Sequence, residues 1–135
     1  MQHPERAIAT ASTHVKPGGV FVIVLNHPSF RIPRQSSWEI DEKQHLQYRR
    51  INRYMSPLEI PVAAAPSRGK KSPVTWSFHQ PLSAYTQFLA DAGFLIARLE
   101  EWISDKKSEG RQATREDRSR QEFPLFLAIK AVKGS

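Results

Sequence analysis

The strongest constraint on this chain is a short apolar run close to the start of the sequence. A turn, Pro17-Gly18-Gly19, leads into six apolar residues, Val20 to Leu25, and the run stops at Asn26-His27-Pro28. An uninterrupted apolar run of this length between turn signals predicts a strand buried on both faces, as in parallel sheets. Such strands belong to α/β domains, which bind ligands near the carboxyl ends of their strands. We therefore expect an α/β domain with a ligand site just after Leu25.

Composition narrows the class of protein further. The 135 residues suit one domain with a core of its own. The sequence contains no cysteine, which excludes disulfides and thiolate metal sites and fits a reducing cytoplasm. No segment reaches the roughly 18 apolar residues of a membrane span, so we expect a cytoplasmic protein without membrane contact. The five histidines show no short metal-ligand spacing, and no metal site is predicted.

Four further segments carry framework signals. Residues 4–15 and 82–92 have apolar side chains at helical spacing, and the second helix is predicted to end at Gly93. Residues 94–100 and 123–132 are predicted strands. Between these strands, residues 112–122 are almost wholly polar and indicate either a solvated helix or a disordered tether.

Residues 29–80 interrupt this framework. Residues 46–55 and 73–79 alternate between apolar and polar side chains, and we expect them to pair as one antiparallel hairpin with a long loop. Residues 29–38 are predicted to be irregular because Pro33 breaks any regular element. Residues 57–66 are predicted to be extended, as an edge or a loop. The whole region is interpreted as an insertion on the substrate side of the domain.

Three short motifs, in order, resemble a known family. Val15-Lys-Pro-Gly-Gly-Val-Phe-Val-Ile23, Asp91-Ala-Gly-Phe-Leu95 and Phe126-Leu-Ala-Ile-Lys-Ala131 are similar to the segments that introduce or form the fifth, sixth and seventh strands of class I S-adenosylmethionine-dependent methyltransferases. In that family the last strand is antiparallel and inserts between the other two. The resemblance covers nearly the whole chain apart from the inserted hairpin.

The resemblance implies a partial Rossmann-like methyltransferase sheet. It would contain the last three strands, the final one antiparallel, with an inserted β-hairpin and flanking helices, and residues 1–135 would form a single partial domain. The family's cofactor-binding elements, a Gly-rich loop after the first strand and an acidic residue ending the second, have no counterpart in the sequence. No cofactor-binding residue is therefore assigned. Full-length relatives would methylate a small or medium acceptor with S-adenosylmethionine, and this chain alone is expected to bind no cofactor and to have no independent activity.

Candidate site residues follow the first strand and extend into the insertion. His27 is the candidate catalytic base, since its unperturbed pKa lies near neutrality, and it is also a candidate substrate ligand; the alternative is that it only hydrogen-bonds a loop backbone. The other candidate substrate-binding residues are Asn26, Arg31, Arg34, Trp38, Tyr48 and Trp76. The two arginines are suited to clamping a carboxylate or phosphate. The alternative is that they are exposed loop residues, and that the aromatic side chains only pack the hairpin onto the domain.

Three hypotheses about function remain open. In the first, the chain is an N-terminally truncated methyltransferase. In the second, it is a subunit of a methyltransferase that either is split, so that the chain pairs with a complementary N-terminal half, or forms by self-association of the chain. The third hypothesis, ranked last, is a nucleic-acid-binding module. It rests on seven basic residues against one acidic residue between Lys43 and Lys71, within a chain of net charge +7. That patch is also explained as solvated surface.

Overall fold

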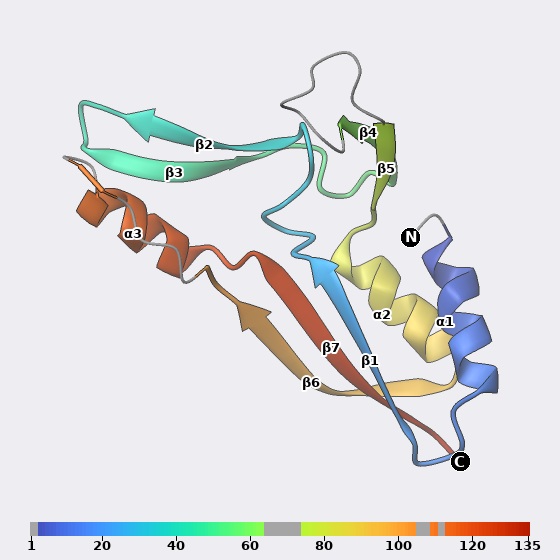
Figure 1. Cartoon of the computed structure of the whole chain (residues 1–135). Coiled ribbons are helices and arrows are strands. Elements are labelled where there is room, and N and C mark those ends of the chain that lie inside the picture. Colours follow the sequence, from blue (N-terminus) through green and yellow to red (C-terminus); the bar gives the residue numbers. More distant parts are fainter. Residues whose placement is uncertain (1–2, 64–73, 105–108, 111–112) are drawn as a thin grey trace.

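A small sheet formed by β1 (Val20–Asn26), β7 (Phe126–Lys133) and β6 (Phe94–Trp102) organises the structure (Figure 1). The computed structural model describes residues 3–63, 74–104, 109–110 and 113–135. Within them, β7 lies between β1 and β6 and runs antiparallel to both. The prediction of an α/β fold is confirmed.

The turn before β1 is hydrogen-bonded to the end of β7. Gly18 has a φ of 80°, a left-handed conformation that glycine adopts without strain. Its N–H donates to the Lys133 carbonyl at 2.8 Å, and the Lys133 N–H donates to the Gly19 carbonyl at 2.9 Å. These bonds extend the β1–β7 ladder into the turn. The Pro-Gly-Gly segment is thus a strand-entry turn, as predicted.

Two helices cover one face of the sheet. α1 (Pro4–Thr13) and α2 (Leu82–Asp91) pack together beside β1 and β6 (Figure 1). Alternate residues of the strands point toward these helices and form the core with them. The buried core consists of Ile8, Ile23, Tyr85, Leu89, Phe94, Leu127, Ile129 and Ala131. Both helices begin and end close to where the sequence predicts.

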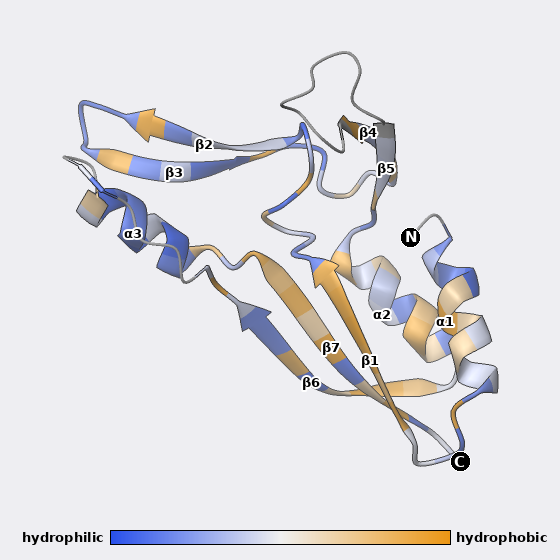
Figure 2. Ribbon diagram, in the orientation of Figure 1, coloured by the Kyte–Doolittle hydropathy of each residue, from blue (hydrophilic) through white to orange (hydrophobic). Residues whose placement is uncertain are grey.

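The opposite face of the sheet is open, which corrects the prediction that the first strand is buried on both faces. β1 is apolar along its length (Figure 2), yet Val20, Val22 and Val24 are 51%, 55% and 48% exposed. On β6, Leu95 belongs to the same open face and is 72% exposed. An apolar strand is buried on both faces only when a layer of structure covers each face of its sheet. Among the described residues, helices α1 and α2 cover one face, and the other face is left exposed.

The inserted region forms two hairpins, and the prediction of a single hairpin is wrong. β3 (Leu46–Ile51) pairs with β2 (Ser36–Asp41), and β5 (Val74–His79) pairs with β4 (Leu58–Ala63). Each predicted strand therefore pairs with the segment just before it, because a shorter connection closes at a lower entropic cost than a longer one. Asp41 makes the first turn, since its carboxylate accepts the N–H groups of Lys43 and Gln44.

The polar segment before the last strand is a helix, α3 (Ala113–Glu122). It lies beside the β2–β3 hairpin (Figure 1). The ring of Phe123, just after α3, packs edge-on against Trp38 at 5.5 Å and against Phe30 at 5.4 Å. These aromatic contacts fix the hairpin to the end of the sheet.

In the described part of the chain, no helix has both the length and the apolar character needed to cross a membrane.

Candidate functional site

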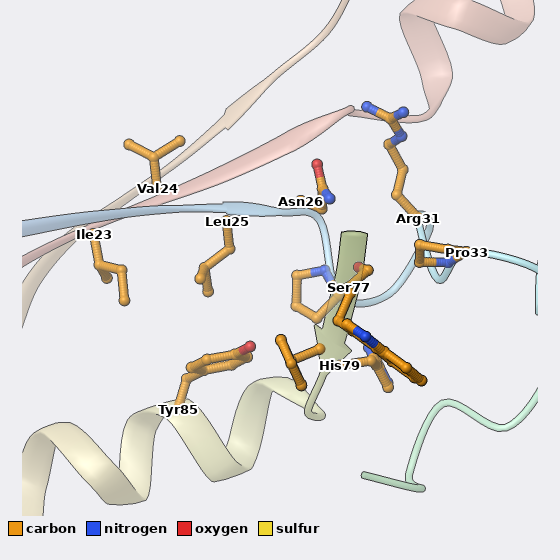
Figure 3. Close-up of a pocket in the computed structure, with 12 residues that line it drawn as sticks. Ile23, Val24, Leu25, Asn26, Arg31, Pro33, Ser77, His79 and Tyr85 are labelled. Carbon is orange, nitrogen blue, oxygen red and sulfur yellow. The ribbon is translucent and has the colours of Figure 1, made fainter. Parts of the chain in front are cut away.

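A cavity of 460 Å³ lies at the carboxyl end of β1, where open α/β sheets bind ligands (Figure 3). Its walls come from β1, the loop after β1, β5 and α2. The lining residues are Ile23, Val24, Leu25, Asn26, Pro28, Arg31, Pro33, Trp76, Ser77, Phe78, His79 and Tyr85. Three of the candidate ligands predicted from sequence, Asn26, Arg31 and Trp76, therefore line one cavity.

The cavity has an apolar side and a polar side. The side chains of Ile23 and Leu25 point toward the ring of Tyr85, which rises from α2 (Figure 3). Asn26 and Arg31 point to the opposite side of the strand (Figure 3). For the residues of β1 this difference follows from strand alternation, which sends odd-numbered residues toward the helices and even-numbered ones, such as Asn26, away. A ligand at this end of β1 meets an apolar wall and a cationic group.

His79 and Tyr85 are neutral polar groups in the cavity wall, and both were missed by the sequence analysis. His79 is buried, and its Nε2 donates to the Tyr54 carbonyl at 2.7 Å. Burial lowers the pKa of His79, and the hydrogen bond to Tyr54 offsets this in part. Burial raises the pKa of the Tyr85 hydroxyl. The signal for His79 was present in the sequence, because it shares one face of the alternating β5 segment with Ser77.

His27 lies outside the cavity lining and is held by hydrogen bonds at both ring nitrogens. Its ring is 4% exposed, and Nε2 lies 2.6 Å from Oε2 of Glu101 on β6. The Ser29 N–H donates to Nδ1 at 3.2 Å. An accepting Nδ1 means that Nε2 carries the proton and donates to Glu101. Because both ring nitrogens have partners, this geometry suits His27 to joining β1 and β6 better than to taking a proton from a ligand.

Trp38 belongs to a separate, smaller cavity of 140 Å³. Arg31 and Arg49 also line it, and the guanidinium of Arg49 lies 5.0 Å from the centre of the Trp38 ring. In the sequence, Arg49 is only one of the seven basic residues between Lys43 and Lys71. The contact with Trp38 on β2 identifies Arg49 as a residue of this smaller cavity.

The two other candidate ligands, Arg34 and Tyr48, lie apart from these cavities. Arg34 is exposed in the loop after β1, with a φ of 64°. Tyr48 is exposed on β3, opposite Glu39 of β2. The structure thus groups Asn26, Arg31, Trp38 and Trp76 around the end of β1 and leaves Arg34 and Tyr48 outside. Pairing of β3 with β2 rather than with β5 places Tyr48 away from Trp76.

Comparisons with known proteins identify the fold. No protein-family model matches this sequence, and a search of curated proteins finds no match. The structure of an S-adenosylmethionine-dependent methyltransferase from Mesorhizobium loti is similar to this chain, with a TM-score of 0.67 and 24% sequence identity. The aligned region covers 96% of this chain and 55% of the Mesorhizobium loti chain. A protein from Listeria monocytogenes assigned to the same activity matches 97% of this chain and 55% of its own, with a TM-score of 0.69 and 22% identity.

The chain has the fold of part of an S-adenosylmethionine-dependent methyltransferase. This confirms, for the fold, the resemblance drawn from the three sequence motifs. The chain spans little more than half the length of the two solved structures that it matches.

The lining of the 460 Å³ cavity favours an anionic group over the cationic part of the methyl donor. S-adenosylmethionine carries a sulfonium and an ammonium group, which carboxylates bind well, and also a carboxylate of its own. Among the described residues that line this cavity there is no Asp or Glu, and Arg31 supplies a positive charge. A second cation beside Arg31 is disfavoured by like-charge repulsion. The polar side of this cavity therefore suits an anionic group better than a sulfonium or an ammonium group.

Two further predictions concern metals and nucleic acid. Among the described residues, no group of three or more His, Asp or Glu side chains is placed to hold a metal ion. Of the basic patch between Lys43 and Lys71, the residues Arg68, Lys70 and Lys71 lie outside the described residues. Arg50 of the same patch is 3.5 Å from Glu39 and hydrogen-bonded to Ser37.

Proposed function

We propose that this chain is the acceptor-binding part of a Rossmann-like S-adenosylmethionine-dependent methyltransferase. The observation that carries the proposal is the fold match, which covers 96% of this chain but 55% of the Mesorhizobium loti methyltransferase. The cavity after β1 supports it, because that position is where α/β sheets bind ligands. The methyl donor is then held by polypeptide outside these 135 residues, since a Gly-rich phosphate- or nucleoside-binding loop is missing from the sequence.

The open face of the sheet supports the same proposal. Val20, Val22, Val24 and Leu95 expose apolar side chains on this face, beside the charged side chains of Lys130 and Arg98. β1 pairs with β7 along one edge only, among the described residues, and a free edge readily accepts another strand. We assign this face to the remaining, donor-binding part of the methyltransferase fold. When the chain is studied alone, self-association through the same face is expected.

Donor binding tests the proposal in two steps. Isothermal titration of the chain alone with S-adenosylmethionine is expected to show no binding at micromolar concentrations. Micromolar binding would show that the donor site lies within the chain.

The second step is a chimaera in which this chain replaces the matched segment of the Mesorhizobium loti methyltransferase. We expect the chimaera to melt cooperatively and to bind S-adenosylhomocysteine, because the donor site lies in the retained segment. A chimaera that fails to fold, or that folds without binding the ligand, counts against the proposal, since the chain must complete the same fold.

A further inference from the structure

Two arginines face the same pair of cavities beyond the end of β1. Arg31, from the loop after β1, and Arg49, from β3, both line the 140 Å³ cavity that contains Trp38. Both also line an adjoining cavity of 270 Å³, which Asn26 borders. Arg31 also borders the 460 Å³ cavity, and its side chain lies on the same side of β1 as that of Asn26 (Figure 3). Arg31 therefore borders three cavities and shares two of them with Arg49.

Neutral groups position both arginines. Arg49 Nε donates to the Phe30 carbonyl at 2.8 Å, and Nη2 donates to Ser36 Oγ at 3.0 Å. Its guanidinium also stacks on Trp38, and the guanidinium of Arg31 lies 5.7 Å from the centre of the Phe126 ring. These contacts fix the direction of each side chain without neutralising its charge.

The charge of the pair is uncompensated within the described residues. Neither arginine forms an ion pair with a carboxylate there, and neither shared cavity has an Asp or Glu in its lining. Burial, and then the charges of Arg31 and Arg50, lower the pKa of Arg49. Two cations held near each other in partly desolvated cavities create a field that favours an anion.

We propose that Arg31 and Arg49 form a binding site for an oxyanion, a carboxylate or a phosphate monoester, with the Asn26 amide as a further donor. The planar fork of each guanidinium matches the geometry of such a group. The rings of Trp38 and Phe123 suit a flat, aromatic body attached to the anion. If the proposed function holds, this ligand is the methyl acceptor, which is then an acidic aromatic molecule; the anion site itself does not depend on methyl transfer.

Binding of small probes to the full chain tests this site directly. Phenyl phosphate and benzoate represent the two oxyanions, and benzamide is the neutral probe of the same shape. By isothermal titration we expect at least one of the two anions to bind with a Kd below about 1 mM, and benzamide to bind at least about tenfold more weakly. Binding of the anion is expected to weaken as salt rises. The stronger anion identifies the oxyanion that the site prefers.

Matched variants assign the binding to the two arginines. Arg31→Gln is expected to weaken anion binding at least about tenfold, because one charge-assisted contact is lost. Arg49→Lys keeps the charge but loses the fork, and we expect it to weaken binding as well. Arg6→Gln, exposed on α1, removes the same charge elsewhere and is expected to leave the Kd within about twofold. Circular dichroism confirms that each variant folds.

The site would be overturned by equal binding of benzamide, by binding that Arg31→Gln leaves unchanged, or by the absence of anion binding. These outcomes leave the donor-binding experiments untouched, because the probes are titrated without S-adenosylmethionine.

Discussion

At the scale of single residues, His79 combines burial with one defined hydrogen bond. Because Nε2 donates to the Tyr54 carbonyl, Nδ1 is the acceptor of the neutral ring. Burial lowers the pKa of His79 from its ordinary value of 6.5. The folded chain therefore resists taking up a proton that the unfolded chain accepts near neutrality. This makes the stability of the fold dependent on pH.

We expect the free energy of unfolding to fall as pH drops below about 6.5, the pKa of the unfolded histidine. The sign follows from proton counts: between the folded and unfolded pKa values the unfolded state binds more protons, so stability rises with pH. Urea unfolding at pH 7.5 and 5.5 measures the change. His79→Gln should reduce it, whereas His14→Gln, at an exposed position, should not. An equal pH dependence in wild type and His79→Gln would show that His79 is not responsible.

The pair His27–Glu101 gives a second prediction at this scale. Glu101→Ala leaves the buried Nε2–H of His27 without its acceptor, which costs about 1 kcal/mol of stability. This loss of stability is small because Glu101 is 57% exposed, so water can in part replace its carboxylate as the acceptor. Glu101→Gln retains an acceptor oxygen and should recover most of the loss.

Glu100→Ala is the matched control, because its carboxylate pairs with the exposed Arg98 at 3.5 Å. We expect it to cost less than about 0.5 kcal/mol. Urea denaturation midpoints compare the three variants. A loss at Glu101 no larger than at Glu100 would show that the His27 contact adds nothing to stability.

At the scale of elements, Gly93 controls how α2 passes into β6. Its φ of 87° is a left-handed conformation, and its N–H donates to the Ala90 carbonyl at 3.0 Å to close the helix. A Cβ at this position would meet no atom within 4 Å, so the cost of substitution is backbone strain alone. We expect Gly93→Ala to destabilise the chain by about 1 kcal/mol.

Two variants check this assignment by urea unfolding. Gly93→Asn should cost less than Gly93→Ala, because asparagine tolerates the left-handed region better. Gly134→Ala, where a Cβ would lie an ordinary 3.5 Å from the Gly93 carbonyl, should be nearly neutral. If Gly93→Ala is also neutral, the helix ends without needing glycine at this position.

Elements with strong local signals were predictable from sequence, and elements defined by their partners were not. Gly93 and Pro81 marked the limits of α2, and the apolar run marked β1. β2 was missed because Pro33 dominated the interpretation of residues 29–38, although Trp38 and Ile40 already alternate with polar neighbours. β4 was predicted only as an extended edge or loop, because proline argues against a central strand; a two-stranded ribbon tolerates Pro61 at an unpaired edge.

The position of the candidate site was predictable from the end of one strand. Asn26 ends β1 and Arg31 lies in the loop that follows, so the end of that strand locates them. Arg49 and Glu101 reach the same region from β3 and β6, through pairings between distant segments. No local pattern marks such residues, because their role depends on which strands become neighbours. The hairpin register decided that Arg49 joins the site and that Tyr48 does not.

At the scale of the whole molecule, the open face of the sheet exposes apolar side chains to water. We expect the chain alone to self-associate as its concentration rises, because the face formed by Val20, Val22, Val24 and Leu95 is apolar and exposed. Sedimentation velocity should show species heavier than the 15.4 kDa monomer. A stable monomer at high concentration would contradict this expectation and would weaken the assignment of the face as an interface.

A charge on this face tests which surface is involved. Val22→Glu places a carboxylate beside Lys130 of β7, which is itself paired with Arg98 of β6, so the sheet gains a favourable cross-strand pair. The fold should therefore survive while association is lost. Thr10→Glu adds the same charge on the exposed surface of α1 and should leave association unchanged. If Val22→Glu folds and still associates like the wild type, contacts other than the open sheet face hold the copies together.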